Sequence, residues 1–281
     1  MISLDYFRAL LLGVIQGLTE FLPVSSSAHL AVAQKWMGLD PESLTLQLFD
    51  GFSHIGTLLA VAYVFLQPIL RYLRRLLAET KSTWTGRRYA MKIAGLGIVA
   101  SIPTAAIGLG LKETLEAAFG NMLEIGIELI ITGGLLVVMA WIPRGRRGWR
   151  DFSWWNAFLI GVAQGVAIFP GISRSGATIC TAAFLGIRRR WAVEFSFLIS
   201  FPAIVGATIL VFKDAMDLGR GQFDALPWGP ILAGSLASLV IGVVSLRLLI
   251  GAVRRAKLHY FAVYCWLAGA AIVLSTLTTP R

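Results

Sequence analysis

The sequence has little charge and very few cysteines. Only 14% of its 281 residues are Asp, Glu, Lys or Arg, whereas 57% are hydrophobic, and the mean hydropathy is +0.74. This composition excludes an ordinary soluble domain and is typical of a polytopic membrane protein. The two cysteines, Cys180 and Cys265, lie in apolar stretches without metal-type spacing. They cannot form a disulfide framework, and we expect both to be small buried hydrophobic residues.

Acidic residues are scarcer than basic ones, 15 against 25, which gives a net charge of +10. The basic residues fall in short segments between apolar stretches, at 71–92, 144–150, 188–190 and 254–257. A soluble nucleic-acid-binding face would gather them together, so we expect no nucleic-acid partner. The pattern instead matches the basic cytoplasmic loops of membrane proteins, and the connections 112–121 and 213–228 should face outside.

The start of the chain has no basic region followed by a cleavage site, so we expect it to remain in the mature protein. Beyond it, six apolar stretches have the length, about 17 to 25 residues, that a membrane-spanning helix needs. They are 49–67, 93–111, 122–142, 191–212, 228–250 and 259–277. The fold class is therefore an all-α integral membrane protein with six transmembrane helices.

Residues 9–29 and 157–177 align without a gap, with nine of 21 positions identical. Each copy is a short apolar run broken by Pro, Gly and Ser, which indicates a re-entrant hairpin, although a kinked spanning helix is the alternative. One hairpin and three spans per half would invert the second half. We therefore expect one membrane domain over 1–281, with inverted repeats at about 1–145 and 150–281 and the two tips meeting near the midplane.

Serines stand at both tips, at 25–27 and 173–175, directly before a second apolar run. They are plausible N-caps of the second arm of each hairpin, and a helix N-terminus attracts anions such as phosphate. Two such ends facing each other would form an anion site. For Ser25, Ser27 and Ser173, ordinary capping is the alternative.

Arg174 is the single charge in the second tip. An arginine at bilayer depth costs at least about 2.5 to 3.5 kcal/mol, so it needs a partner or a water-filled cavity. Its planar fork suits phosphate oxygens, and an ion pair with Glu20 is the structural alternative.

The first tip carries further chemistry. Glu20 shares a helical face with Gln16, and His29 follows Ser26 by three residues, which makes His29 a candidate nucleophile or general base. Other polar residues in apolar segments are expected at span ends or between helices: Asp50, His54, Glu124, Glu128 and Glu194.

The segments 16–29 (QGLTEFLPVSSSAH) and 170–178 (PGISRSGAT) resemble the two signature motifs of the bacterial undecaprenyl-diphosphate phosphatases, the BacA/UppP bacitracin-resistance family. The resemblance implies hydrolysis of undecaprenyl diphosphate to the monophosphate and inorganic phosphate, which recycles the lipid carrier for peptidoglycan synthesis. It also implies a bacterial plasma-membrane location. In the topology that the basic segments predict, the first repeat enters from the outer side, so we expect the site to face the periplasm. The essential residues would be Glu20, Ser26, His29 and Arg174. The assisting residues would be Gln16, Ser173, Ser175 and Thr178. Ser25 and Ser27 of the first tip are added as candidate substrate-binding residues.

The resemblance leaves several alternatives open. Either Ser26 or His29 could be the nucleophile, and Glu20 could bind a divalent cation, Mg or Ca, although Gln16 supplies no second carboxylate. The expected partners are a prenyl diphosphate and membrane lipid, and a homo-oligomer is conceivable. An inverted-repeat lipid transporter or flippase would share the architecture, alone or combined with the phosphatase.

Overall fold

The computed structural model describes residues 3–78, 83–143, 145–217, 223–254 and 258–278, without the side chains of 66–90, 116, 150, 253 and 254. Much of the basic charge behind the orientation prediction lies outside these described side chains. The residues concerned are Arg71, Arg74, Arg75, Lys81, Arg87, Arg88, Arg144, Arg150, Arg254, Arg255 and Lys257.

Six long helices account for the six predicted spans, three of which run one residue past a helix end, and each helix is apolar enough over at least 18 residues to cross a membrane. They are α3 (Leu44–Ala78), α4 (Thr83–Gly110), α6 (Met122–Trp141), α9 (Arg189–Asp217), α11 (Trp228–Arg254) and α12 (Tyr260–Thr278). Short helices α5 (Lys112–Gly120) and η1 (Trp149–Asp151) lie in connections. In the part of the chain described, no β-strand accompanies them. The all-helical fold class is confirmed.

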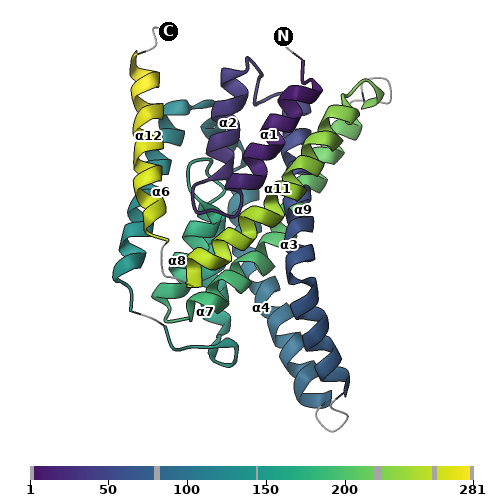
Figure 1. Cartoon of the computed structure of the whole chain (residues 1–281), viewed down its shortest axis with the longest axis vertical. Helices are drawn as coiled ribbons and strands as arrows, with labels where there is room; N and C mark the ends of the chain where they lie inside the picture. The colour runs from purple at the N-terminus through teal and green to yellow at the C-terminus, as the bar shows by residue number, and fades with distance from the viewer. Residues whose placement is uncertain (1–2, 79–82, 144, 218–222, 255–257, 279–281) are drawn as a thin grey trace.

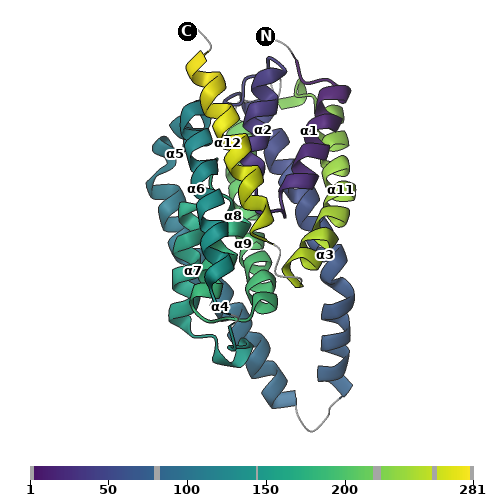
Figure 2. The same cartoon turned by 60° about the vertical axis from the view of Figure 1, so that its left-hand side comes forward.

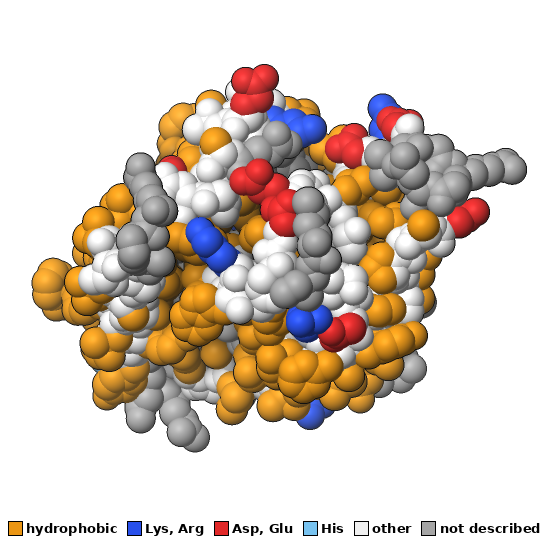
Figure 3. All heavy atoms as spheres, turned by 90° about the horizontal axis from the view of Figure 1, so that it is seen from above, with side chains coloured by type: hydrophobic (Ala, Val, Ile, Leu, Met, Phe, Trp, Pro, Cys, Tyr) orange, Lys and Arg blue, Asp and Glu red, His pale blue; other side chains and the backbone are white. Residues whose placement is uncertain are grey.

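The outer surface of these helices is apolar. Large hydrophobic side chains are exposed along α9, α11 and α12, and Leu267 is 69% exposed. Seen from the end that carries the termini, hydrophobic side chains cover much of the rim, and charged side chains gather on the facing surface (Figure 3). A soluble protein rarely exposes so much contiguous apolar surface. The chain is a multi-pass membrane protein.

The two repeated segments form two pairs of short helices. They are α1 (Tyr6–Thr19) with α2 (Ser26–Trp36), and α7 (Trp154–Val166) with α8 (Arg174–Phe184). The second arms match position by position: both contain 11 residues, both begin after a serine N-cap, and both are followed by a glycine with positive φ, Gly38 at 70° and Gly186 at 75°. The sequence repeat is therefore also a repeat of local structure.

Each helix pair packs against a long helix of the other half. Helix α1 lies on α11 and α7 lies on α4, while α6 pairs with α12. The contacts need small residues, because a Cβ on Gly13 would overlap the backbone of Gly234, and one on Gly161 would overlap that of Ala100. Figures 1 and 2 show α1 and α2 in the half of the molecule that carries the termini, and α7 and α8 in the opposite half. The inverted topology itself stays a prediction.

The largest apolar core lies around the two tips. It joins Phe21 of the first tip to Ile179 of α8 and Phe197 of α9, and the rings of Phe21 and Phe197 meet edge to face at 5.5 Å. Cys180 and Cys265 are free thiols buried in the same core, as predicted. The tips are thus held in a packed interior.

Candidate active site

The two tips meet and bond to each other, as the repeat predicts. The hydroxyls of Ser25 and Ser27 both donate to the carbonyl oxygen of Pro170, the latter over 2.7 Å. In the other direction, the hydroxyl of Ser175 donates to the Leu22 carbonyl over 3.4 Å. Residues about 145 positions apart are therefore fixed against each other.

Serine capping shapes each tip. The Ser25 hydroxyl accepts the N–H of Ala28 at 3.4 Å, and that of Ser173 accepts the N–H of Gly176 at 3.1 Å. Ser25 also has a φ of 63°, a value that residues other than glycine rarely adopt. The predicted N-caps are confirmed, and the backbone at Ser25 is strained.

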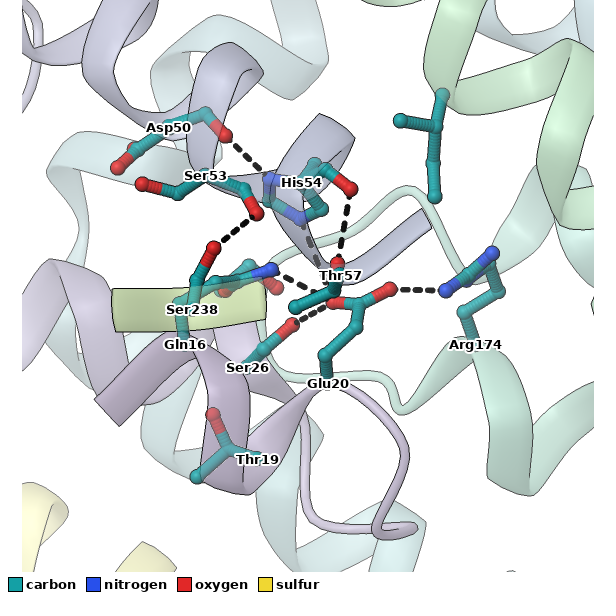
Figure 4. Close-up of polar contacts among 12 residues, drawn as sticks. Gln16, Thr19, Glu20, Ser26, Asp50, Ser53, His54, Thr57, Arg174 and Ser238 are labelled. Carbon is teal, nitrogen blue, oxygen red and sulfur yellow. Dashed lines mark hydrogen bonds and ion pairs between the residues drawn. The ribbon is translucent and has the colours of Figure 1, made fainter. Parts of the chain in front are cut away.

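Glu20 is the centre of a buried polar cluster (Figure 4). This carboxylate is only 6% exposed and uses both of its oxygens. Oε1 forms an ion pair with Nη2 of Arg174, while Oε2 accepts the hydroxyl of Ser26 at 2.7 Å and the side-chain amide of Gln16 at 3.0 Å. The structure therefore brings together four site residues predicted from the sequence: Gln16, Glu20, Ser26 and Arg174. It also contains the ion pair between Glu20 and Arg174 that the sequence offered as an alternative.

Arg174 is the first residue of α8, where the helix dipole disfavours a cation. Glu20 offsets this cost on one side of the guanidinium. The other terminal nitrogen, Nη1, is buried and has no hydrogen-bond partner within the described residues. A buried cationic N–H group is costly to leave unpaired, so this nitrogen is suited to an incoming anion.

His54 of α3, for which the sequence favoured an interfacial or helix-pairing role over a place in the site, belongs to the cluster. Its Nε2 lies 3.5 Å from Oε2 of Glu20, and its Nδ1–H donates to the Asp50 carbonyl at 2.6 Å. A signal was present in the sequence, because Asp50, Ser53, His54 and Thr57 form an i, i+3, i+4, i+7 polar stripe on an apolar helix. The stripe does not say which neighbouring helix it faces.

Two residues of α6 hold the second tip. The Glu128 carboxylate accepts the N–H of Gly171 at 2.7 Å, and the Thr132 hydroxyl accepts the N–H of Ser173 and donates to the Gly171 carbonyl, both at 3.0 Å. For Glu128 the sequence favoured an interfacial or helix-pairing role. In the structure it fixes the loop that presents Arg174. Glu194 does lie near a helix start, paired with exposed Arg190 at 2.9 Å.

The remaining predicted residues lie around the cluster. His29 bonds to the Ser25 carbonyl and to the Tyr264 hydroxyl of α12, not to Glu20. Ser173 and Ser175 have hydroxyls 3.3 Å apart. Thr178 is fully buried and bonds to the Arg174 carbonyl at 2.7 Å and to the Ser196 hydroxyl at 2.6 Å, so it connects α8 to α9.

A divalent cation would find few ligands here. Within the described ranges, no group of three or more His, Cys, Asp or Glu residues could hold a metal ion. Glu20 would offer a single carboxylate, and Arg174 already neutralises it. Divalent Mg and Ca prefer several anionic or carbonyl oxygens. The donor set does not fit a tightly held cation, and the proposed reaction uses none.

Together these features define a class: a polytopic helical membrane protein with a buried site where the tips of two helix pairs meet. The site combines a serine hydrogen-bonded to a carboxylate with an arginine whose Nη1 has no partner in the described part of the chain. The chain belongs to the bacitracin resistance protein BacA family, whose model matches residues 9–271.

Similar proteins cover nearly the whole chain. One from Alkaliphilus metalliredigens (strain QYMF) is 42% identical over 276 residues, which are 96% of this chain and 98% of the relative. Another, from Desulfatibacillum aliphaticivorans, is 40% identical over 282 residues, 97% of this chain and 99% of the relative. A third, from Methanosphaera stadtmanae, is 34% identical over 98% of this chain and 99% of the relative. All three carry the name undecaprenyl-diphosphatase.

Proposed function

We propose that this protein hydrolyses undecaprenyl diphosphate to undecaprenyl phosphate and inorganic phosphate, and so recycles the lipid carrier for peptidoglycan synthesis and confers bacitracin resistance. The family and the names of its relatives support this activity. One observation carries the proposal at the level of atoms. The Ser26 hydroxyl is bonded to a buried carboxylate that also pairs with Arg174, whose Nη1 still lacks a partner among the described residues.

In this proposal the diphosphate binds between the tips. The free nitrogen of Arg174 contacts the terminal phosphate, and the N-terminus of α8 adds backbone N–H groups and a partial positive charge. The same groups stabilise the negative charge that spreads over the phosphoryl oxygens during transfer. Binding would weaken the Glu20–Arg174 pair and leave the carboxylate free to accept a proton.

Ser26 is our nucleophile, because its hydroxyl already donates to Glu20 at 2.7 Å. Its oxygen attacks the terminal phosphorus and Glu20 takes its proton. The bond from that phosphorus to the bridging oxygen breaks, and the electron pair leaves with undecaprenyl phosphate. A phosphoserine forms. Attack by His29 remains the alternative, and the phosphoenzyme experiment in the Discussion separates the two.

Water completes the cycle in a second step. It attacks the phosphoserine while His29, which follows Ser26 by three residues on α2, takes a proton from the water. The bond between phosphorus and the serine oxygen breaks, and Glu20 returns its proton to Ser26. Inorganic phosphate leaves with the proton held by His29, so the protein regains its starting state.

The membrane arrangement follows from the helix pairs. We propose that α1–α2 and α7–α8 are re-entrant hairpins of an inverted repeat, which would place the site near the bilayer midplane. The reciprocal packing of α1 on α11 and α7 on α4 supports this arrangement. The prenyl chain would remain among apolar helices, and access to the headgroup would be from the periplasmic side.

The test is phosphate release by purified protein, supplied with prenyl diphosphates of several chain lengths, alongside a lipid-transport assay in liposomes. We expect release from the long-chain substrate. Transport of lipid without release of phosphate would overturn the proposal and favour a transporter. Arg190→Ala removes an arginine whose side chain is 74% exposed. It is the matched control for Arg174→Ala and should release phosphate at the normal rate.

A further inference from the structure

His29 has its own pair of partners outside the Glu20 cluster. Its Nδ1 lies 2.7 Å from the Ser25 carbonyl oxygen, and its Nε2 lies 2.6 Å from the Tyr264 hydroxyl. The two rings are also nearly parallel, at 9°, with centroids 5.6 Å apart. Tyr264 comes from α12, 235 residues further along the chain. The last helix therefore reaches the first tip.

These contacts determine which nitrogen of the neutral imidazole carries the hydrogen. A carbonyl oxygen can only accept, so Nδ1 carries the hydrogen and donates it to Ser25. The neutral ring then has its lone pair on Nε2, and the Tyr264 hydroxyl donates to that lone pair. Nε2 is thus the nitrogen that could accept a proton from water. The hydroxyl of Tyr264 is hydrogen-bonded to this nitrogen.

We propose that Tyr264 is a positioning residue for the reaction. Its ring and hydroxyl fix the plane of the His29 imidazole and direct Nε2 as the acceptor, and the attacking water takes the place of the hydroxyl in the second step. This role rests on the proposed function, in which His29 accepts a proton from the attacking water. Packing alone would need only the ring, whereas the bond to Nε2 needs the oxygen.

The test separates the oxygen from the ring. Tyr264→Phe keeps the ring and removes the hydroxyl, so kcat should fall about tenfold, a part of the roughly 10²- to 10⁴-fold that a general base contributes. KM should fall together with kcat, so that kcat/KM stays within about twofold, because the first step, with Arg174 and the tips, is untouched. Phosphoenzyme should accumulate, because the second step is slowed. Tyr63→Phe, which removes the hydroxyl of a tyrosine 62% exposed on α3, is the matched control.

A second readout needs no turnover. The chain has three histidines, so nitrogen NMR of histidine-labelled protein gives few signals, and His29→Gln assigns those of His29. In Tyr264→Phe the Nε2 signal should move toward that of a lone-pair nitrogen without a hydrogen bond, while Nδ1 stays protonated. Tyr63→Phe should move neither signal.

An unmoved Nε2 signal, or a moved signal with unchanged kcat and phosphoenzyme level, would overturn the positioning role. If the wild-type protein released no phosphate, the proposed function would fall, and the role of Tyr264 in catalysis would fall with it. The NMR comparison would still decide whether Tyr264 holds His29, so the two failures are distinguishable.

Discussion

At the scale of single residues, one ion pair determines the charge balance of the site. Glu20 is 6% exposed and Arg174 lies at the start of a helix inside the molecule. Removing one partner of a buried pair leaves the other charge uncompensated, which costs about 3–5 kcal/mol. Loss of activity in a single variant could therefore be confused with loss of folding. A mutational test of Glu20 and Arg174 thus needs a variant that removes both charges.

Arg174→Ala should lower kcat/KM for phosphate release by about 10²- to 10³-fold, the range seen when a group that stabilises transition-state charge is removed. Arg174→Lys should recover only part of this, because an ammonium cannot make a bidentate contact. Melting temperatures in detergent provide the folding control. The double variant Glu20→Gln/Arg174→Ala should melt above Arg174→Ala yet stay inactive. Near-normal turnover by folded Arg174→Ala would argue against the anion clamp.

The nucleophile can be identified by trapping the phosphoenzyme. With substrate labelled on the terminal phosphate, we expect an acid-stable label on Ser26, because phosphoserine survives acid and phosphohistidine does not. His29→Ala should retain more of this label than the wild type, because the second step lacks its base. Acid-labile label that survives in Ser26→Ala would instead identify His29 as the nucleophile.

At the scale of elements, close helix contacts place the hairpins. Gly13 of α1 faces the backbone of Gly234 in α11 so closely that a methyl group would overlap it, whereas Gly206 of α9 has open space around its Cα. Gly13→Ala should therefore destabilise the protein by about 1–3 kcal/mol through overpacking. Gly206→Ala should be neutral or slightly stabilising, because alanine favours helix. Equal melting temperatures of the two variants would show that α1 does not depend on this contact.

The backbone at Ser25 gives a second test of an element. Ser25→Ala and Ser25→Gly both remove the hydroxyl that bonds to Pro170, but only glycine adopts a φ of 63° without strain. The glycine variant should therefore be more stable by about 1 kcal/mol, measured by unfolding in detergent. The reverse order would mean that the start of α2 is not strained.

Much of this architecture could be predicted from the sequence. The six spans follow from apolar length, and the tips with their serine caps follow from a repeat that also holds in local structure, as Gly38 and Gly186 show. The sequence assigned His54 and Glu128 less weight than the site residues and did not single out Tyr264. Each lies on a long helix distant in sequence, and a polar residue on one helix face does not reveal which neighbour it meets. Helix packing decides that, through contacts such as those of Gly13 and Gly161.

At the scale of the whole molecule, the termini lie at one end, while the end of α3 and the start of α4 lie at the other (Figures 1 and 2). The basic segments predict that the end with the termini faces outside. A cysteine at exposed Glu113 of α5 should react with a membrane-impermeant thiol reagent in intact cells, and one at exposed Arg146 only after lysis. The native Cys180 and Cys265 are buried and should add little background. The opposite labelling pattern would reverse the orientation.

The most direct measurement is an experimental structure with a non-hydrolysable prenyl diphosphate, in which a methylene group replaces the bridging oxygen. Our account predicts the terminal phosphonate between the two tips, within hydrogen-bond reach of Nη1 of Arg174 and of the Ser26 hydroxyl. A headgroup bound by one tip alone, or outside the interior where the tips meet, would contradict it.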